Sequence, residues 1–219
     1  MKVSLSKLTK APNGKAAGGK ADMVTDVQVV ERLRRQDGPT FQALVERLQH
    51  PLTGYLHRLV GDREVALDLA QDTFLQVYKE IGRTSGELKL EAWIYRIATN
   101  YALRYLNRKR LRQFIHLESQ DGVDPTLATA GPEEQTMTRV LVQQALSRMN
   151  PKDAAIVQLH FGNGFTYEEI SQILQISPEA VRKRVGRCAV KFRTLYEEAP
   201  AAQTSSVVTQ FVAHKRDGR

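Results

Sequence analysis

The sequence contains one cysteine, Cys188, in 219 residues, which excludes an internal disulfide and is typical of a reducing compartment. The five histidines are scattered, and no spacing of His, Cys, Asp or Glu matches a metal site. No apolar run approaches the length that crosses a bilayer, and no apolar segment follows the N-terminal lysines as in a secretory signal. No glycine-rich loop for a phosphate is present. These absences predict a cytoplasmic protein without a cofactor, a bound metal or membrane insertion.

Positive charge, in contrast, is abundant. The net charge is +8 and the isoelectric point is about 9.7. Such an excess of positive charge favours a polyanionic partner, and nucleic acid is a more common partner of this kind than a membrane surface. A chain of this length can bury a core in one domain or in two small ones.

The stretch 166–192 predicts two helices joined by a tight turn. Thr166 and Glu169 form a capping box that starts the first helix. Ser177 caps the second helix, and Pro178 occupies its first position, where the missing N–H costs nothing.

The second helix of this pair has an apolar side and a basic side. Its apolar positions recur at helical spacing, at Val181, Val185, Cys188 and Phe192. The residues expected to face DNA are Ser177, Glu179, Arg182, Lys183 and Arg187. A helix anchored on one side and polar on the other suits a DNA major groove, so we predict a helix-turn-helix. The alternative is an ordinary helical hairpin with a solvated basic face, and the coincidence of caps and basic face favours DNA binding.

The segment 62–81 predicts a helix with a core stripe and a second, polar face. The core stripe is Ala66, Ala70, Phe74, Val77 and Ile81. The polar face collects Asp68, Gln71, Asp72 and Leu75. A leucine within such a patch is typical of a protein-docking surface. A solvated face with one exposed leucine is the alternative, and spacing alone favours that alternative.

A long helix over 90–112 follows, with its buried side at Leu90, Ile94, Ile97, Tyr101 and Tyr105. Another side carries Trp93, Arg96, Asn100, Arg104 and Asn107, and basic residues including Arg108 crowd the C-terminal end. The residues expected to bind DNA here are Trp93, Arg96, Asn100, Arg104 and Arg108. Aromatic, amide and guanidinium groups together suit single-stranded nucleic acid, because bases stack on rings and arginines neutralise phosphates. The alternative for Trp93 is a place in the core.

We therefore predict an all-α protein of two small helical domains, the second a helix-turn-helix of winged-helix-like type without a clear wing. The expected organisation is a disordered basic extension over 1–22, a helical domain over 23–112, a flexible acidic linker over 113–132, a DNA-binding domain over 133–199 and a tail over 200–219. The linker is inferred from its acidic residues and its glycines and prolines.

The chain resembles a bacterial sigma factor of the extracytoplasmic-function group over roughly residues 24 to 196. The segments that carry the resemblance are DREVALDLAQDTFLQVYKEI at 62–81, EAWIYRIATNYALRYLNRKR at 91–110, and 145–161 through the helix-turn-helix. The resemblance implies that the Asp68/Gln71/Asp72/Leu75 face docks on core RNA polymerase. It further implies that the helix with Trp93 and Asn100 opens and reads the promoter −10 element, and that the helix-turn-helix reads the −35 element.

The same resemblance implies promoter DNA as a partner, a monomer when free, and an anti-sigma factor as a further expected partner. Two positions depart from the family pattern. Gln175 stands where the turn usually has Gly, so it must adopt a left-handed conformation or the turn must differ. Arg104 stands where the family often has an acidic residue.

The predicted function is that of a transcription initiation factor, not an enzyme. The alternative is a stand-alone helix-turn-helix regulator of the response-regulator type, which the helical character of 24–112 disfavours. A third possibility, a metal enzyme using Asp68 and Asp72, lacks further ligands at matching spacing.

Overall fold

The computed structural model describes residues 26–117 and 134–198, and every regular element in these two ranges is helical. The α-helices are α1 (Asp26–Arg34), α2 (Gly38–Val60), α3 (Arg63–Glu80), α4 (Leu90–Leu117), α5 (Glu134–Ser147), α6 (Pro151–Val157), α7 (Tyr167–Leu174) and α8 (Pro178–Glu197). The all-α prediction is confirmed. The predicted basic extension over 1–22, the predicted tail over 200–219 and most of the predicted linker lie outside the described residues.

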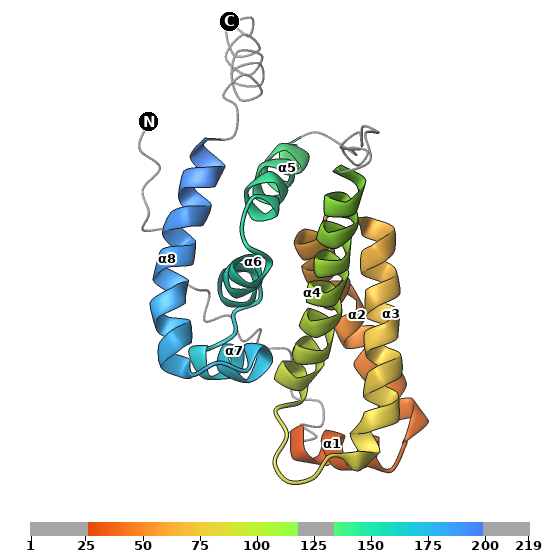
Figure 1. The fold of residues 1–219 in the computed structure, drawn as a ribbon. Coiled ribbons are helices and arrows are strands. Elements are labelled where there is room, and N and C mark those ends of the chain that lie inside the picture. Colours follow the sequence, from red (N-terminus) through yellow and green to blue (C-terminus); the bar gives the residue numbers. More distant parts are fainter. Residues whose placement is uncertain (1–25, 118–133, 199–219) are drawn as a thin grey trace, which may run out of the picture.

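The first four helices pack as one group (Figure 1). Asp37 caps α2 by accepting a hydrogen bond from the backbone of Thr40, and Asp62 caps α3 in the same way through Glu64 and Val65. Pro51 lies inside α2 without ending it. Burial of Leu48 and Leu52 on either side of it outweighs the one lost backbone hydrogen bond.

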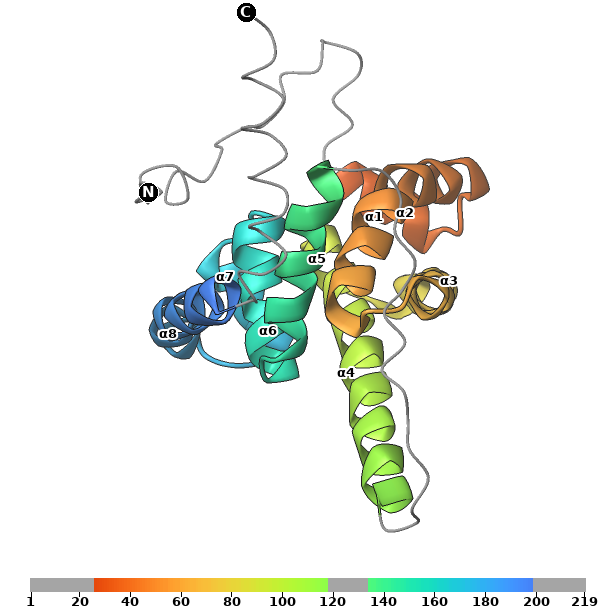
Figure 2. The ribbon, with the colours of Figure 1, turned by 90° about the horizontal axis from the view of Figure 1, so that it is seen from above.

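Helix α4 begins where predicted but runs to Leu117, five residues beyond Arg112. Residues 107–112 are exposed, and the C-terminal half of the helix projects beyond the other helices (Figure 2). Its N-terminal half is the part that enters the core, through Leu90, Ile94 and Ala98.

The second group comprises α5 to α8. Asn150 caps α6 through the backbone of Lys152, and Pro151 starts that helix. A π-helical turn, Gln158–Gly162, then follows directly; it was not predicted. Val181, Val185 and Cys188 of α8 are buried, as their spacing predicts.

The two groups lie against each other, with α4 packed on α7 and α2 beside α5 (Figure 1). The buried apolar residues form one continuous cluster that extends from α1 to α8. Among the described helices none is long and apolar enough to cross a membrane.

Candidate nucleic-acid and polymerase interfaces

The helix-turn-helix forms as the sequence predicts. The Thr166 hydroxyl accepts from the backbone of Glu169, and the Glu169 carboxylate accepts from the backbone of Thr166, which completes the capping box. Gln175 adopts the left-handed conformation, with φ 54° and ψ 47°. The Ser177 hydroxyl accepts from the backbone of Ala180 at 3.2 Å. Both helices of the motif are therefore fixed at their N-termini by side chains.

All five residues predicted to face DNA from this motif are exposed: Ser177, Glu179, Arg182, Lys183 and Arg187. They do not all point the same way. The Arg182 guanidinium lies over the Tyr167 ring, 5.9 Å from its centroid, on the side of α8 that faces α7. Lys183, one residue on, is turned about 100° away from it. Ser177 contributes its hydroxyl to the cap, so its hydrogen-bonding capacity is partly used within the motif.

The face of α3 predicted as a docking surface is solvent-exposed in full. Asp68, Gln71, Asp72 and Leu75 are all exposed. The structure adds two residues that the sequence reasoning missed, Leu67 and Tyr78, which are 45% and 40% exposed. Their spacing from Gln71 and Leu75 follows the helical repeat and could have identified them. The face is therefore an apolar stripe bordered by two carboxylates, rather than one leucine in a polar patch.

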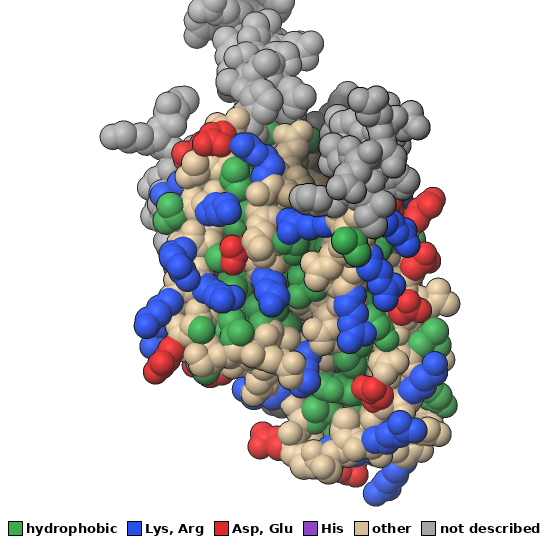
Figure 3. Space-filling model, viewed as in Figure 1, with side chains coloured by type: hydrophobic (Ala, Val, Ile, Leu, Met, Phe, Trp, Pro, Cys, Tyr) green, Lys and Arg blue, Asp and Glu red, His purple; other side chains and the backbone are tan. Residues whose placement is uncertain are grey.

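The face of α4 divides into two parts. Asn100, Arg104 and Arg108 are exposed, whereas Trp93 and Arg96 are half-buried. The Trp93 side chain packs against the hydrophobic core with part of its ring accessible. Lys and Arg side chains are spread over the surface formed by α8, α6 and α4, and acidic side chains are fewer there (Figure 3).

Polar contacts join the two helical groups beneath these surfaces. Arg58 of α2 donates to the buried Gln158 amide oxygen at 2.7 Å, and Asn163 donates to the Tyr95 hydroxyl of α4 at 3.1 Å. The Tyr95 ring also meets the Phe165 ring edge-on, with centroids 4.8 Å apart. Burial raises the pKa of Tyr95 to about 12, so its hydroxyl stays neutral at pH 7.

Sequence comparison adds to this geometry. The family model for Sigma-70 region 2 matches residues 44–112, which include α3 and most of α4. The model for Sigma-70, region 4 matches residues 139–188, which include α7 and the first half of α8. An RNA polymerase sigma-H factor of Pseudomonas aeruginosa is 30% identical over 171 residues, covering 74% of this chain and 89% of the relative. The chain belongs to the extracytoplasmic-function sigma factors.

Further relatives agree with this assignment. An ECF RNA polymerase sigma-E factor of Escherichia coli K12 is 28% identical over 176 residues, covering 76% of this chain and 92% of the relative. As a sigma factor, the protein directs RNA polymerase to promoters. Because both region 2 and region 4 are present in one chain, a stand-alone helix-turn-helix regulator is not favoured.

Two solved structures share the fold of this sigma factor. CnrH in complex with the cytosolic domain of CnrY has a TM-score of 0.59 and 20% identity, covering 78% of this chain and 97% of that chain. The sigma factor RpoE in complex with the anti-sigma factor NepR from Bartonella quintana has a TM-score of 0.55 and 20% identity, covering 73% and 98%. At this identity the likeness concerns the fold.

Proposed function

We propose that three surfaces of this sigma factor divide the work of initiation. The α3 face binds core RNA polymerase, α4 opens and reads the −10 element, and α8 reads the −35 element. The protein acts in the cytoplasm as an initiation factor and not as an enzyme by itself. The observation that carries the proposal is the exposure of polar and charged side chains on each of the three helices: Asp68, Gln71 and Asp72 on α3, Asn100, Arg104 and Arg108 on α4, and Glu179, Arg182 and Lys183 on α8.

The polymerase surface rests on the exposed stripe of Leu67, Leu75 and Tyr78 beside Asp68 and Asp72. Apolar side chains supply area that becomes desolvated on binding, while the carboxylates select a basic partner surface. Three large apolar residues aligned on one exposed helix face are typical of a protein-binding site, whereas single exposed apolar residues are not.

The −10 surface rests on the accessible part of Trp93 together with Asn100, Arg104 and Arg108. The ring can stack on an unpaired base, and the arginines can neutralise phosphates along the projecting half of α4. Arg104 strengthens the positive charge at a position where an acidic residue is common in the family.

The −35 surface rests on Glu179, Arg182 and Lys183 near the N-terminal end of α8. Arginine and lysine can donate hydrogen bonds to the major-groove edge of guanine, and a carboxylate can accept a hydrogen bond from the amino group of cytosine. Arg187, about one turn further on, is better placed for a phosphate. An anti-sigma factor is proposed as a further partner, since CnrH is in complex with the cytosolic domain of CnrY and the Bartonella RpoE is in complex with the anti-sigma factor NepR.

The test of this proposal is holoenzyme formation by the Asp72→Arg variant. Charge reversal in the centre of the α3 face should abolish co-purification with core RNA polymerase while the helical circular dichroism signal remains. Glu46→Arg is the matched control, because Glu46 is an equally exposed acid on α2 outside this face. Unchanged co-purification of Asp72→Arg would show that polymerase binds elsewhere.

A further inference from the structure

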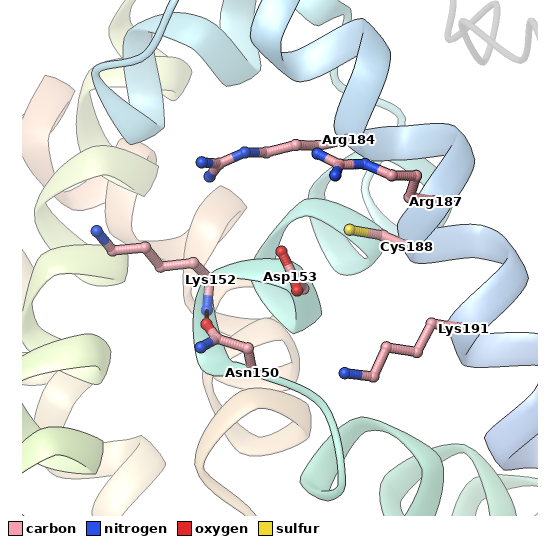
Figure 4. A pocket seen from close by; sticks show the side chains of 7 residues that line it. All are labelled: Asn150, Lys152, Asp153, Arg184, Arg187, Cys188 and Lys191. Atoms are coloured by element: carbon pink, nitrogen blue, oxygen red, sulfur yellow. Dashed lines mark hydrogen bonds between the residues drawn. The ribbon is translucent and has the colours of Figure 1, made fainter.

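A hollow of about 370 Å³ opens between the start of α6 and the flank of α8. Figure 4 shows Arg184 and Arg187 reaching from α8 toward α6, with Lys191 entering further along the same helix. Lys152 lines the hollow from α6, and Asn150 and Cys188 complete the wall. Asp153 is the one carboxylate in the lining.

The hollow is strongly cationic. Four basic side chains line it, and none of the four forms an ion pair or side-chain hydrogen bond with another residue whose side chain the structure describes. Asp153 lies beside the Cys188 thiol. Burial raises the pKa of Cys188 to about 11, so the thiol is neutral at pH 7 and adds no negative charge. The described lining therefore has four cations and one carboxylate, an excess of positive charge that favours an anionic ligand.

The position of the hollow identifies the source of that anion. Arg184, Arg187 and Lys191 are three and four residues apart, so they form one stripe along α8. Arg184 is about 200° around the helix from Arg182, which faces α7. The two arginines therefore mark opposite flanks of the helix, with Lys183 between them on the outer side.

A helix in the major groove meets phosphates on both flanks. An α-helix with its side chains is about 10–12 Å wide, and the groove is about 12 Å wide, so both phosphate backbones come close to it. One strand passes the flank of α8 beside α7. The hollow lies on the flank where the other strand must pass.

We infer that the hollow lined by Lys152, Arg184, Arg187 and Lys191 binds backbone phosphates of the second DNA strand at the −35 element. The inference rests on the proposed reading role of α8 and extends it to α6 and to a second strand. Lys152 belongs to no part of the helix-turn-helix motif, so the DNA interface includes a residue that motif recognition does not reveal.

The experiment uses holoenzyme assembled from core RNA polymerase and the full chain, bound to a promoter duplex over a salt series. The double variant Lys152→Ala/Lys191→Ala should weaken binding equally for all single-base variants of the −35 element. The slope of log affinity against log salt should flatten by about 1.8, since each phosphate contact contributes about 0.9. Ethylation of individual phosphates should also cease to interfere at positions beside the −35 element on one strand.

The matched control is Arg35→Ala/Arg63→Ala, which removes two exposed charges from the first helical group. A slope equal to that of this control would overturn the inference. Stabilisation of the wild-type protein by inorganic pyrophosphate, lost in the double variant while the DNA slope is unchanged, would assign the hollow to a free anion and equally overturn it. If wild-type holoenzyme shows no preference for a −35 sequence, the proposed function fails as well. If the wild type shows the preference and the double variant has an unaltered salt slope, only the phosphate-binding role of the hollow is rejected.

Discussion

Gln175 is one of two non-glycine residues with a left-handed backbone among the described residues; Gln36 is the other. Gln175 holds φ 54° at the end of α7, where an L-residue other than glycine loses about 1–2 kcal/mol. Glycine relieves this strain but also increases the conformational entropy of the unfolded chain, which offsets part of the gain. Gln175→Gly should therefore raise the free energy of unfolding by about 0.5–1 kcal/mol. Chemical denaturation measures the change. Gln172 is exposed inside the same helix, so Gln172→Gly should lower the free energy of unfolding by about 1 kcal/mol. A lower free energy of unfolding in both variants would contradict the left-handed turn at Gln175.

Arg182 and Arg187 should differ in what they contribute to promoter binding. Arg182 is held over Tyr167 near the N-terminal end of α8, so Arg182→Ala should relax preference at particular −35 positions by about 1–3 kcal/mol. Arg187→Ala should weaken all sequences alike and flatten the salt slope by about one. Binding of holoenzyme to a panel of single-base variants at several salt concentrations separates the two effects. Equal losses on every variant for Arg182→Ala would mean that it contacts the backbone.

At the scale of the element, α4 combines a buried side and a proposed DNA-facing side in one helix. Because part of the Trp93 ring is accessible, Trp93→Ala should slow open-complex formation more than it weakens initial promoter binding. A lost stacking contact corresponds to about 1–3 kcal/mol per base. Permanganate reactivity of unpaired thymines reports the opening, and Trp93→Phe, which keeps a ring, is the control. Unfolding of the Trp93→Ala protein would show that the ring serves the core.

The helices themselves were predictable to the extent that their signals are local. The capping box at Thr166, the Ser177 cap and the apolar stripes of α3 and α8 each depend on residues within a few positions of one another. Pro51 predicts a break locally, yet the buried face of α2 keeps the helix continuous. The π-helical turn at Gln158–Gly162 depends on partners 100 residues away, such as Arg58, which no local pattern contains.

At the scale of the whole molecule, the packing of region 4 on region 2 was not predicted, and it places the two surfaces proposed to read DNA close together. The Tyr95 ring lies 4.8 Å from that of Phe165, and Asn100 is about 7.5 Å further along α4. Arg182 is 5.9 Å from the Tyr167 ring. The surfaces are thus on the order of 30 Å apart. Elements 25 base pairs apart, as the labels −10 and −35 denote, are separated by about 85 Å of DNA.

We therefore expect the two helical groups to separate when the sigma factor engages both promoter elements. The contact between the two helical groups contains features that favour separation. The amide nitrogen of Gln158 and the amide oxygen of Asn163 are buried there without a partner among the described residues. Such groups cost about 1–3 kcal/mol each, which weakens the contact. The sixteen residues between the described ranges can span up to about 55 Å when extended.

Energy transfer between labels tests this separation. Labels at Glu91 and Glu168, both exposed and within four residues of the contacting Tyr95 and Phe165 rings, should be close in the free protein and far apart in the promoter complex, in a Cys188→Ala background. A pair at Gln49 and Ser85, within the first group, should not change. An unaltered Glu91–Glu168 distance would mean that the packed arrangement is also the active one.

The most direct test of the account is run-off transcription with purified core RNA polymerase and genomic fragments. Adding the wild-type chain should produce discrete transcripts that are absent with core enzyme alone. Asp72→Arg should produce none, and Arg182→Ala should produce an altered set. Identical transcripts with and without the wild-type chain would contradict the claim that this protein gives RNA polymerase its promoter specificity.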